Sequence, residues 1–114
     1  MGTGFRATHE HIAHFTNGEP AYYDRSKGNV LRHPRVIKGA RHHQTEKPVE
    51  LLADLVAVTS PPGGVVFDPF GGSGTTACAA ARMGRRSVLS ERDADHCATI
   101  VARLSQSSLF GGAA

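Results

Sequence analysis

Over its second half the chain alternates between short apolar runs and apolar side chains at helical spacing. From residue 52 to 59, and again from residue 97 to 104, mostly apolar side chains recur at every third or fourth position, which predicts two helices with one face on a core. The first helix opens at residues 45–48, and the second begins at Asp93. Two apolar runs, residues 65–68 and 87–90, predict buried strands. This order of elements predicts an α/β fold with the two strands as parallel neighbours.

A glycine-rich turn follows the first of these strands. Asp68 closes the strand, and three glycines between residues 71 and 74 form a tight bend in which the backbone can approach a ligand closely. The small side chains of residues 75–83 then predict a helix that a threonine at its start can cap. A strand, a glycine turn and a helix in this order predict a ligand cradle at the carboxyl end of a parallel strand.

Two classes of cofactor suit this cradle. The spacing of Gly72, Gly74 and Ala77 fits the dinucleotide fingerprint, but small residues at this spacing also occur in plain helix–strand packing. The alternative is S-adenosylmethionine. Asp68 and Phe70 favour it, since a carboxylate can bind the methionine ammonium and an aromatic ring can cover the apolar part of the cofactor.

Glu91 closes the second strand at the same edge of the sheet. A carboxylate there can accept hydrogen bonds from both hydroxyls of a ribose. The alternative is a structural role as an acid at a helix N-terminus. The nearby Asp68 and the glycine turn favour the ribose role.

The first 41 residues show no long apolar pattern. Residues 9–14 and 21–23 are interpreted as edge strands. Residues 29–37 are interpreted as an edge strand or an extended segment, since a proline within them is unsuited to a central strand. Three histidines between residues 9 and 14 are interpreted as surface or packing side chains and not as metal ligands, because a strand would not point all three to one side. The basic side chains of this region suit either contact with nucleic-acid phosphates or a solvated loop; they are Arg25, Lys27, Arg32, Arg35, Lys38 and Arg41.

Composition bounds these interpretations. The 114 residues suffice for one small domain with a net charge of +3, and residues 1–48 carry eight basic against four acidic side chains, which suits a polyanion. No apolar run is long enough to cross a membrane, and Cys78 and Cys97 are expected to be buried, reduced thiols of a cytoplasmic protein. The expected organisation is an edge-strand and basic segment over residues 1–41, an α/β unit over 42–104 and a flexible tail over 105–114.

Two motifs, when both are present in this order, are specific for one protein family. Residues 43–48 read His-Gln-Thr-Glu-Lys-Pro, and residues 67–76 read Phe-Asp-Pro-Phe-Gly-Gly-Ser-Gly-Thr-Thr. Followed by Glu91 and by Ala-Arg-Leu at 102–104, they resemble the C-terminal part of the DNA amino-methyltransferases, the N6-adenine and N4-cytosine enzymes whose catalytic motif precedes the cofactor motifs. The resemblance is close over about residues 42–104.

The resemblance implies part of a Rossmann-like, doubly wound sheet and favours S-adenosylmethionine over a dinucleotide. In this family the methyl group is transferred to an exocyclic amine of a base flipped out of DNA. The implied cofactor-binding residues are Thr45, Lys47, Asp68, Phe70, Gly72, Ser73, Gly74, Thr75 and Glu91. No metal ligand is implied.

The catalytic motif of that family, an Asp, Asn or Ser followed by Pro-Pro and an aromatic residue, is not found in the sequence. Residues 60–63 imitate it with glycine in place of the aromatic residue, and residues 68–70 belong to the cofactor loop. No catalytic residue is therefore assigned, and the chain is expected to be the cofactor-binding half, with the motif upstream of Met1.

A partial sheet would leave an apolar edge and face uncovered. The expected partners are therefore DNA and either a chain that carries the catalytic half or a second copy. A non-catalytic DNA- or cofactor-binding module is the alternative function.

Overall fold

A computed structural model describes residues 4–37, 39 and 46–110 of the chain. Its elements, in chain order, are α1 (Val49–Thr59), β1 (Val65–Asp68), α2 (Thr75–Arg82), β2 (Arg86–Leu89) and α3 (Ala94–Phe110). Each helix and strand expected in the second half of the chain is present, and each begins within a few residues of its predicted start.

The two strands form a parallel pair, as predicted. Val65 lies opposite Arg86, and Phe67 lies opposite Val88. Two further backbone hydrogen bonds continue the ladder past the strand ends: the Ser90 amide donates to the Asp68 carbonyl at 2.9 Å, and the Gly71 amide donates to the Ser90 carbonyl at 2.8 Å. The glycine turn is thereby tied to the residues that follow β2.

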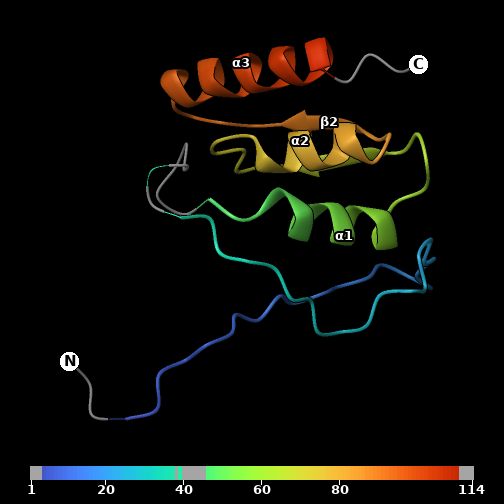
Figure 1. Ribbon diagram of the computed structural model, residues 1–114. Helices are drawn as coiled ribbons and strands as arrows, with labels where there is room; N and C mark the ends of the chain where they lie inside the picture. Colours follow the sequence, from blue (N-terminus) through green and yellow to red (C-terminus); the bar gives the residue numbers. More distant parts are fainter. Residues whose placement is uncertain (1–3, 38, 40–45, 111–114) are drawn as a thin grey trace.

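Helix α2 is the centre of the packing. It lies against both strands and between α1 and α3 (Figure 1). Its buried side chains are small, which allows helices and strands to approach closely. The buried apolar core of the described residues consists of Ala53, Val56, Ala57, Ala77, Ala79 and Ala80.

One face of the sheet carries exposed apolar side chains. Val65, Phe67 and Val88 are 52%, 64% and 54% exposed, and the strand register places them on the same side. Parallel sheets are ordinarily covered on both faces. The expectation of an uncovered apolar face is therefore confirmed for this part of the fold.

Residues 4–37 form an extended segment, the strap, whose later part runs beside α1 (Figure 1). The Tyr23 amide donates to the Val58 carbonyl at 2.9 Å, and the Asp54 carboxylate binds Lys27 and His33 at 2.8 Å each. These contacts fasten the strap to the helix.

The strap corrects one expectation. No described residue in 4–37 belongs to a strand, so the edge strands expected at residues 9–14 and 21–23 are wrong, and of the two alternatives for residues 29–37 the extended segment holds. The strap lies against a helix, whose backbone groups are already bonded internally, and therefore cannot form a ladder there.

Two smaller expectations concern the C-terminal tail and the two cysteines. Helix α3 continues to Phe110, so the first part of the expected tail at 105–114 is helical, while residues 111–114 lie outside the described residues. Cys97 is exposed and Cys78 is partly exposed; both are free thiols, but neither is fully buried. Within the described ranges, no helix has the length and apolar character needed to span a bilayer.

Candidate cofactor site

Asp68 and Glu91 line the same hollow. Asp68 is the last residue of β1, and Glu91 follows the end of β2 by two positions. The parallel pairing brings these two strand ends together, and the glycine turn lies between them. The resulting hollow of about 580 Å³ is within the range of small-molecule sites.

The glycine turn has a backbone that side chains would disturb. Gly72 and Gly74 have φ angles of 54° and 81°, in the left-handed region that favours glycine. The Gly74 amide closes the turn by donating to the Gly71 carbonyl at 2.8 Å. A Cβ at Gly74 would lie 2.9 Å from Cγ1 of Ile100, so α3 packs directly against the turn.

The Asp68 carboxylate braces both ends of this turn. One oxygen accepts a hydrogen bond from the Phe70 amide at 2.9 Å, and the other accepts one from the Thr76 hydroxyl at 2.6 Å. An ionised carboxylate offers about four acceptor sites, so it can still receive a donor from a ligand.

The Glu91 carboxylate, just beyond the end of β2, binds the turn as well. One oxygen accepts from the Gly72 amide at 2.7 Å, and the other accepts from the Asp93 amide at 2.8 Å. These amides, Asp93 first and Gly72 second, hold the pKa of Glu91 below its ordinary value of 4.5, so the group is ionised at neutral pH. Glu91 therefore supports the turn and the start of α3 while it lines the hollow.

The structure brings together most of the other implied cofactor residues. Lys47 lines the hollow with an ammonium that pairs with Glu10 of the strap, and Phe70 stands at the wall with 86% of its surface exposed. Ser73 and Thr75 are buried in the wall. Gly74 lies under Ile100 and is not one of the lining residues, and Thr45 lies outside the described residues.

The hollow includes residues that the sequence argument did not single out. Arg92 and Asp93 directly follow Glu91, and His96 lies on the first turn of α3, so adjacency to a predicted site residue was the available signal. Leu52 lines the hollow because of the way α1 packs, and no local sequence pattern reveals that packing. The additional lining residues are Glu46, Leu52, Gly71, Thr76, Arg92, Asp93 and His96.

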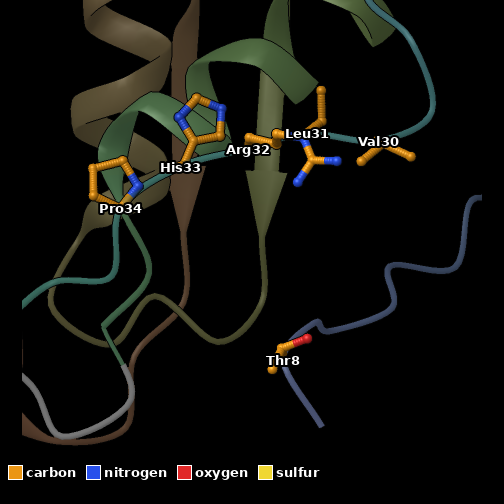
Figure 2. Close-up of a pocket in the computed structure, with 6 residues that line it drawn as sticks. All are labelled: Thr8, Val30, Leu31, Arg32, His33 and Pro34. Carbon is orange, nitrogen blue, oxygen red and sulfur yellow. The ribbon is translucent and has the colours of Figure 1, made fainter.

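A second hollow lies between the beginning of the strap and its residues 30–34. Figure 2 shows Thr8 reaching it from one stretch of the strap and His33 and Pro34 from another. It has no acidic side chain and no glycine turn. The chemistry expected of a cofactor site therefore favours the hollow at Asp68 and Glu91.

Ser60 is the first residue of the sequence that resembles the catalytic motif, and its hydrogen bonds are structural. Its hydroxyl donates to the Val56 carbonyl at 2.5 Å, and the Arg85 guanidinium donates to the Ser60 carbonyl at 2.6 Å. These bonds fasten the end of α1 to the chain entering β2. Among the described residues, no group of three histidine, cysteine or acidic side chains is arranged to hold a metal ion.

Comparisons with known proteins agree with this geometry. The family model described as DNA methylase matches residues 21–102. Two proteins of Escherichia coli (strain K12) are similar in sequence: YubD, named as a methylase, is 40% identical over 75% of this chain, and the DNA adenine methyltransferase YhdJ is 33% identical over 81%. The crystal structure of the M1.HpyAVI–SAM complex matches 75% of the chain with a TM-score of 0.60 and 26% identity.

The chain is much shorter than these relatives. It spans 36% of YubD, 32% of YhdJ and 43% of the M1.HpyAVI chain. The matched part therefore corresponds to about a third of the two E. coli proteins.

Proposed function

Because the chain belongs to the DNA methylase family, we propose that its hollow at Asp68 and Glu91 binds S-adenosylmethionine. The observation that supports the proposal most strongly is the convergence of two ionisable carboxylates and a left-handed glycine turn on one hollow of sufficient size. When bound, the cofactor supplies a methyl group activated by a sulfonium centre.

The residues present suit the two ends of this cofactor. Asp68 has spare acceptor sites for the methionine ammonium, and Glu91 has spare sites for the ribose hydroxyls. The exposed ring of Phe70 is available to cover an apolar part of the ligand. Lys47, Gly72, Ser73 and Thr75 form the rest of the proposed contact surface. Gly74 is proposed to shape the turn behind them, and Thr45 is proposed on the sequence motif alone.

We further propose that the chain is the cofactor-binding part of an enzyme that methylates the exocyclic amine of adenine or cytosine in DNA. The matched part of the chain spans only 36% of YubD and 32% of YhdJ, and no residue here is assigned a catalytic role. A cytoplasmic location is part of the same proposal, because the DNA substrate is found there in bacteria.

The uncovered sheet face suggests how the enzyme would be completed. Val65, Phe67 and Val88 offer an apolar surface, and β1 pairs with β2 on one side only among the described residues. We propose that a chain carrying the catalytic part, or a second copy of this chain, covers this face.

The function is tested by calorimetry of S-adenosylmethionine binding to the full chain and to two variants. Glu91→Ala is expected to weaken binding by about tenfold or more, since it removes a charged acceptor from the site. Glu19→Ala, an exposed acid in the strap, serves as the control and should bind as the unmodified chain does. Equal affinity of both variants would reject the assignment of Glu91.

A second function, a DNA-binding module without a cofactor, has one supporting observation. Three arginines of the strap are exposed: Arg25, Arg32 and Arg35. Lys27, in contrast, forms an ion pair with Asp54. DNA affinity that falls steeply with salt, together with no affinity for S-adenosylmethionine, would favour this function. Cofactor binding would favour the first.

A further inference from the structure

Arg103 of α3 reaches back to the glycine turn. One of its terminal nitrogens, Nη1, donates to the Ser73 carbonyl at 2.7 Å and to the Ser73 hydroxyl at 3.1 Å. The other, Nη2, lies 3.1 Å from a carboxylate oxygen of Glu46. A single guanidinium therefore joins three segments of the chain: α3, the glycine turn, and the residues that lead into α1.

The pair formed by Arg103 and Glu46 is shielded from water. The two side chains are 14% and 4% exposed. A carboxylate removed from water needs a cation and hydrogen-bond donors beside it, and the planar fork of arginine suits this better than a lysine ammonium does. By contrast, the ion pair of Arg82 on α2 with Glu50 on α1 has side chains 56% and 55% exposed and is only a surface contact.

This arrangement fixes one peptide group of the turn from both sides. The Ser73 carbonyl accepts from Arg103, and the Gly74 amide of the same planar group donates to the Gly71 carbonyl at 2.8 Å. Rotation of that peptide would break both bonds. Glu46, held by the same guanidinium, directly precedes Lys47, and both line the hollow.

We propose that Arg103 is a positioning residue for the cofactor site, with Glu46 as its anchor. It holds the Ser73–Gly74 peptide and the segment at residues 46–47 in the arrangement that a ligand meets, without being one of the lining residues itself. The inference rests on the proposed binding of S-adenosylmethionine, because the affinity for that ligand is the property that Arg103 would control.

The test compares full-length Arg103→Ala, Arg103→Lys, Glu46→Gln and the double variant Arg103→Ala with Glu46→Gln. Arg82→Ala is the matched control, since it removes an interhelical arginine that lies outside the site. S-adenosylmethionine affinity is measured by calorimetry well below each variant's melting temperature. Hydrogen exchange of the Gly74 amide is measured without ligand.

Arg103→Ala is expected to weaken S-adenosylmethionine binding on the order of tenfold and to speed exchange at Gly74, with partial rescue by Arg103→Lys. The double variant should lose less affinity than the product of the single losses, since both changes break one network. Arg82→Ala should change neither quantity.

A lowered melting temperature with unchanged affinity and unchanged exchange at Gly74 would overturn the inference, as would strictly multiplicative losses in the double variant. Failure of the unmodified chain to bind S-adenosylmethionine would reject the proposed function instead. In that event the exchange rate at Gly74 still decides whether Arg103 holds the turn.

Discussion

At the scale of single residues, the carboxylates of the candidate site each bond to groups of the fold and also line the hollow. Glu91 accepts from two backbone amides and still lines the hollow, and Asp68 at the end of β1 accepts from one amide and the Thr76 hydroxyl and lines it too. The pKa of Glu91 is lowered, so its support of the turn is present above its ordinary pKa. This support is lost only as the pH falls through the lowered value.

Gly74 gives the sharpest residue-scale prediction. Gly74→Ala places a methyl group at a φ of 81° and 2.9 Å from Ile100, so it should lower the free energy of unfolding by about 2 to 4 kcal/mol. The control Gly63→Ala has a φ of 73° and open space around it, and should cost about 1 kcal/mol. Urea unfolding followed by circular dichroism measures both. Equal costs would show that Ile100 does not restrict the turn.

At the scale of elements, the local part of the fold was predictable and the long-range part was not. The strand, the glycine turn and α2 follow one another within 18 residues, so propensity and glycine spacing sufficed to predict them. The strap depends on Asp54, whose partners Lys27 and His33 are distant in sequence. No pattern in residues 4–37 reveals that their neighbour is a helix, and the expected edge strands failed for that reason.

Asp54 supplies the element-scale prediction. Asp54→Asn removes the charge that binds Lys27 and His33, so the strap should separate more often from α1 and the Tyr23 amide should exchange faster. Lys27 first and His33 next hold the pKa of Asp54 below its ordinary value. The docking should therefore persist above that ordinary value and weaken as the pH falls through the lowered pKa.

The control for the strap is Glu50→Gln, which removes an exposed acid of the same helix. Hydrogen exchange followed by mass spectrometry should show protection of residue 23 unchanged in this variant. Similar deprotection in both variants would indicate a general loosening of α1 and would contradict a specific role for Asp54.

At the scale of the whole molecule, the small core and the uncovered sheet face are consistent with a part of a larger fold. The core is built largely of alanines, and Phe67, the largest apolar side chain on the sheet, is exposed. The sequence predicted this face because two strands alone cannot bury both sides of a parallel sheet. The sequence did not predict the contact of Arg103 with Ser73, because this contact depends on how α3 crosses the glycine turn.

Association is the whole-molecule prediction. In the absence of another chain, the face at Val65, Phe67 and Val88 should drive concentration-dependent self-association, and Phe67→Ser should reduce it. Val30→Ser is the matched control, because Val30 is also 64% exposed but lies on the strap. Sedimentation velocity measures the association. An equal effect of the two variants, or a monomer at every concentration, would contradict a role for the sheet face.

Binding of S-adenosylmethionine in the hollow is tested by titrating the isotope-labelled chain with this ligand and following its backbone amide resonances. We expect saturable shifts concentrated at Gly72, Ser73 and Glu91, with a dissociation constant on the order of 1 mM or tighter, and their loss in Glu91→Ala. Shifts confined to residues away from the hollow, or none up to about 10 mM ligand, would contradict binding in the hollow.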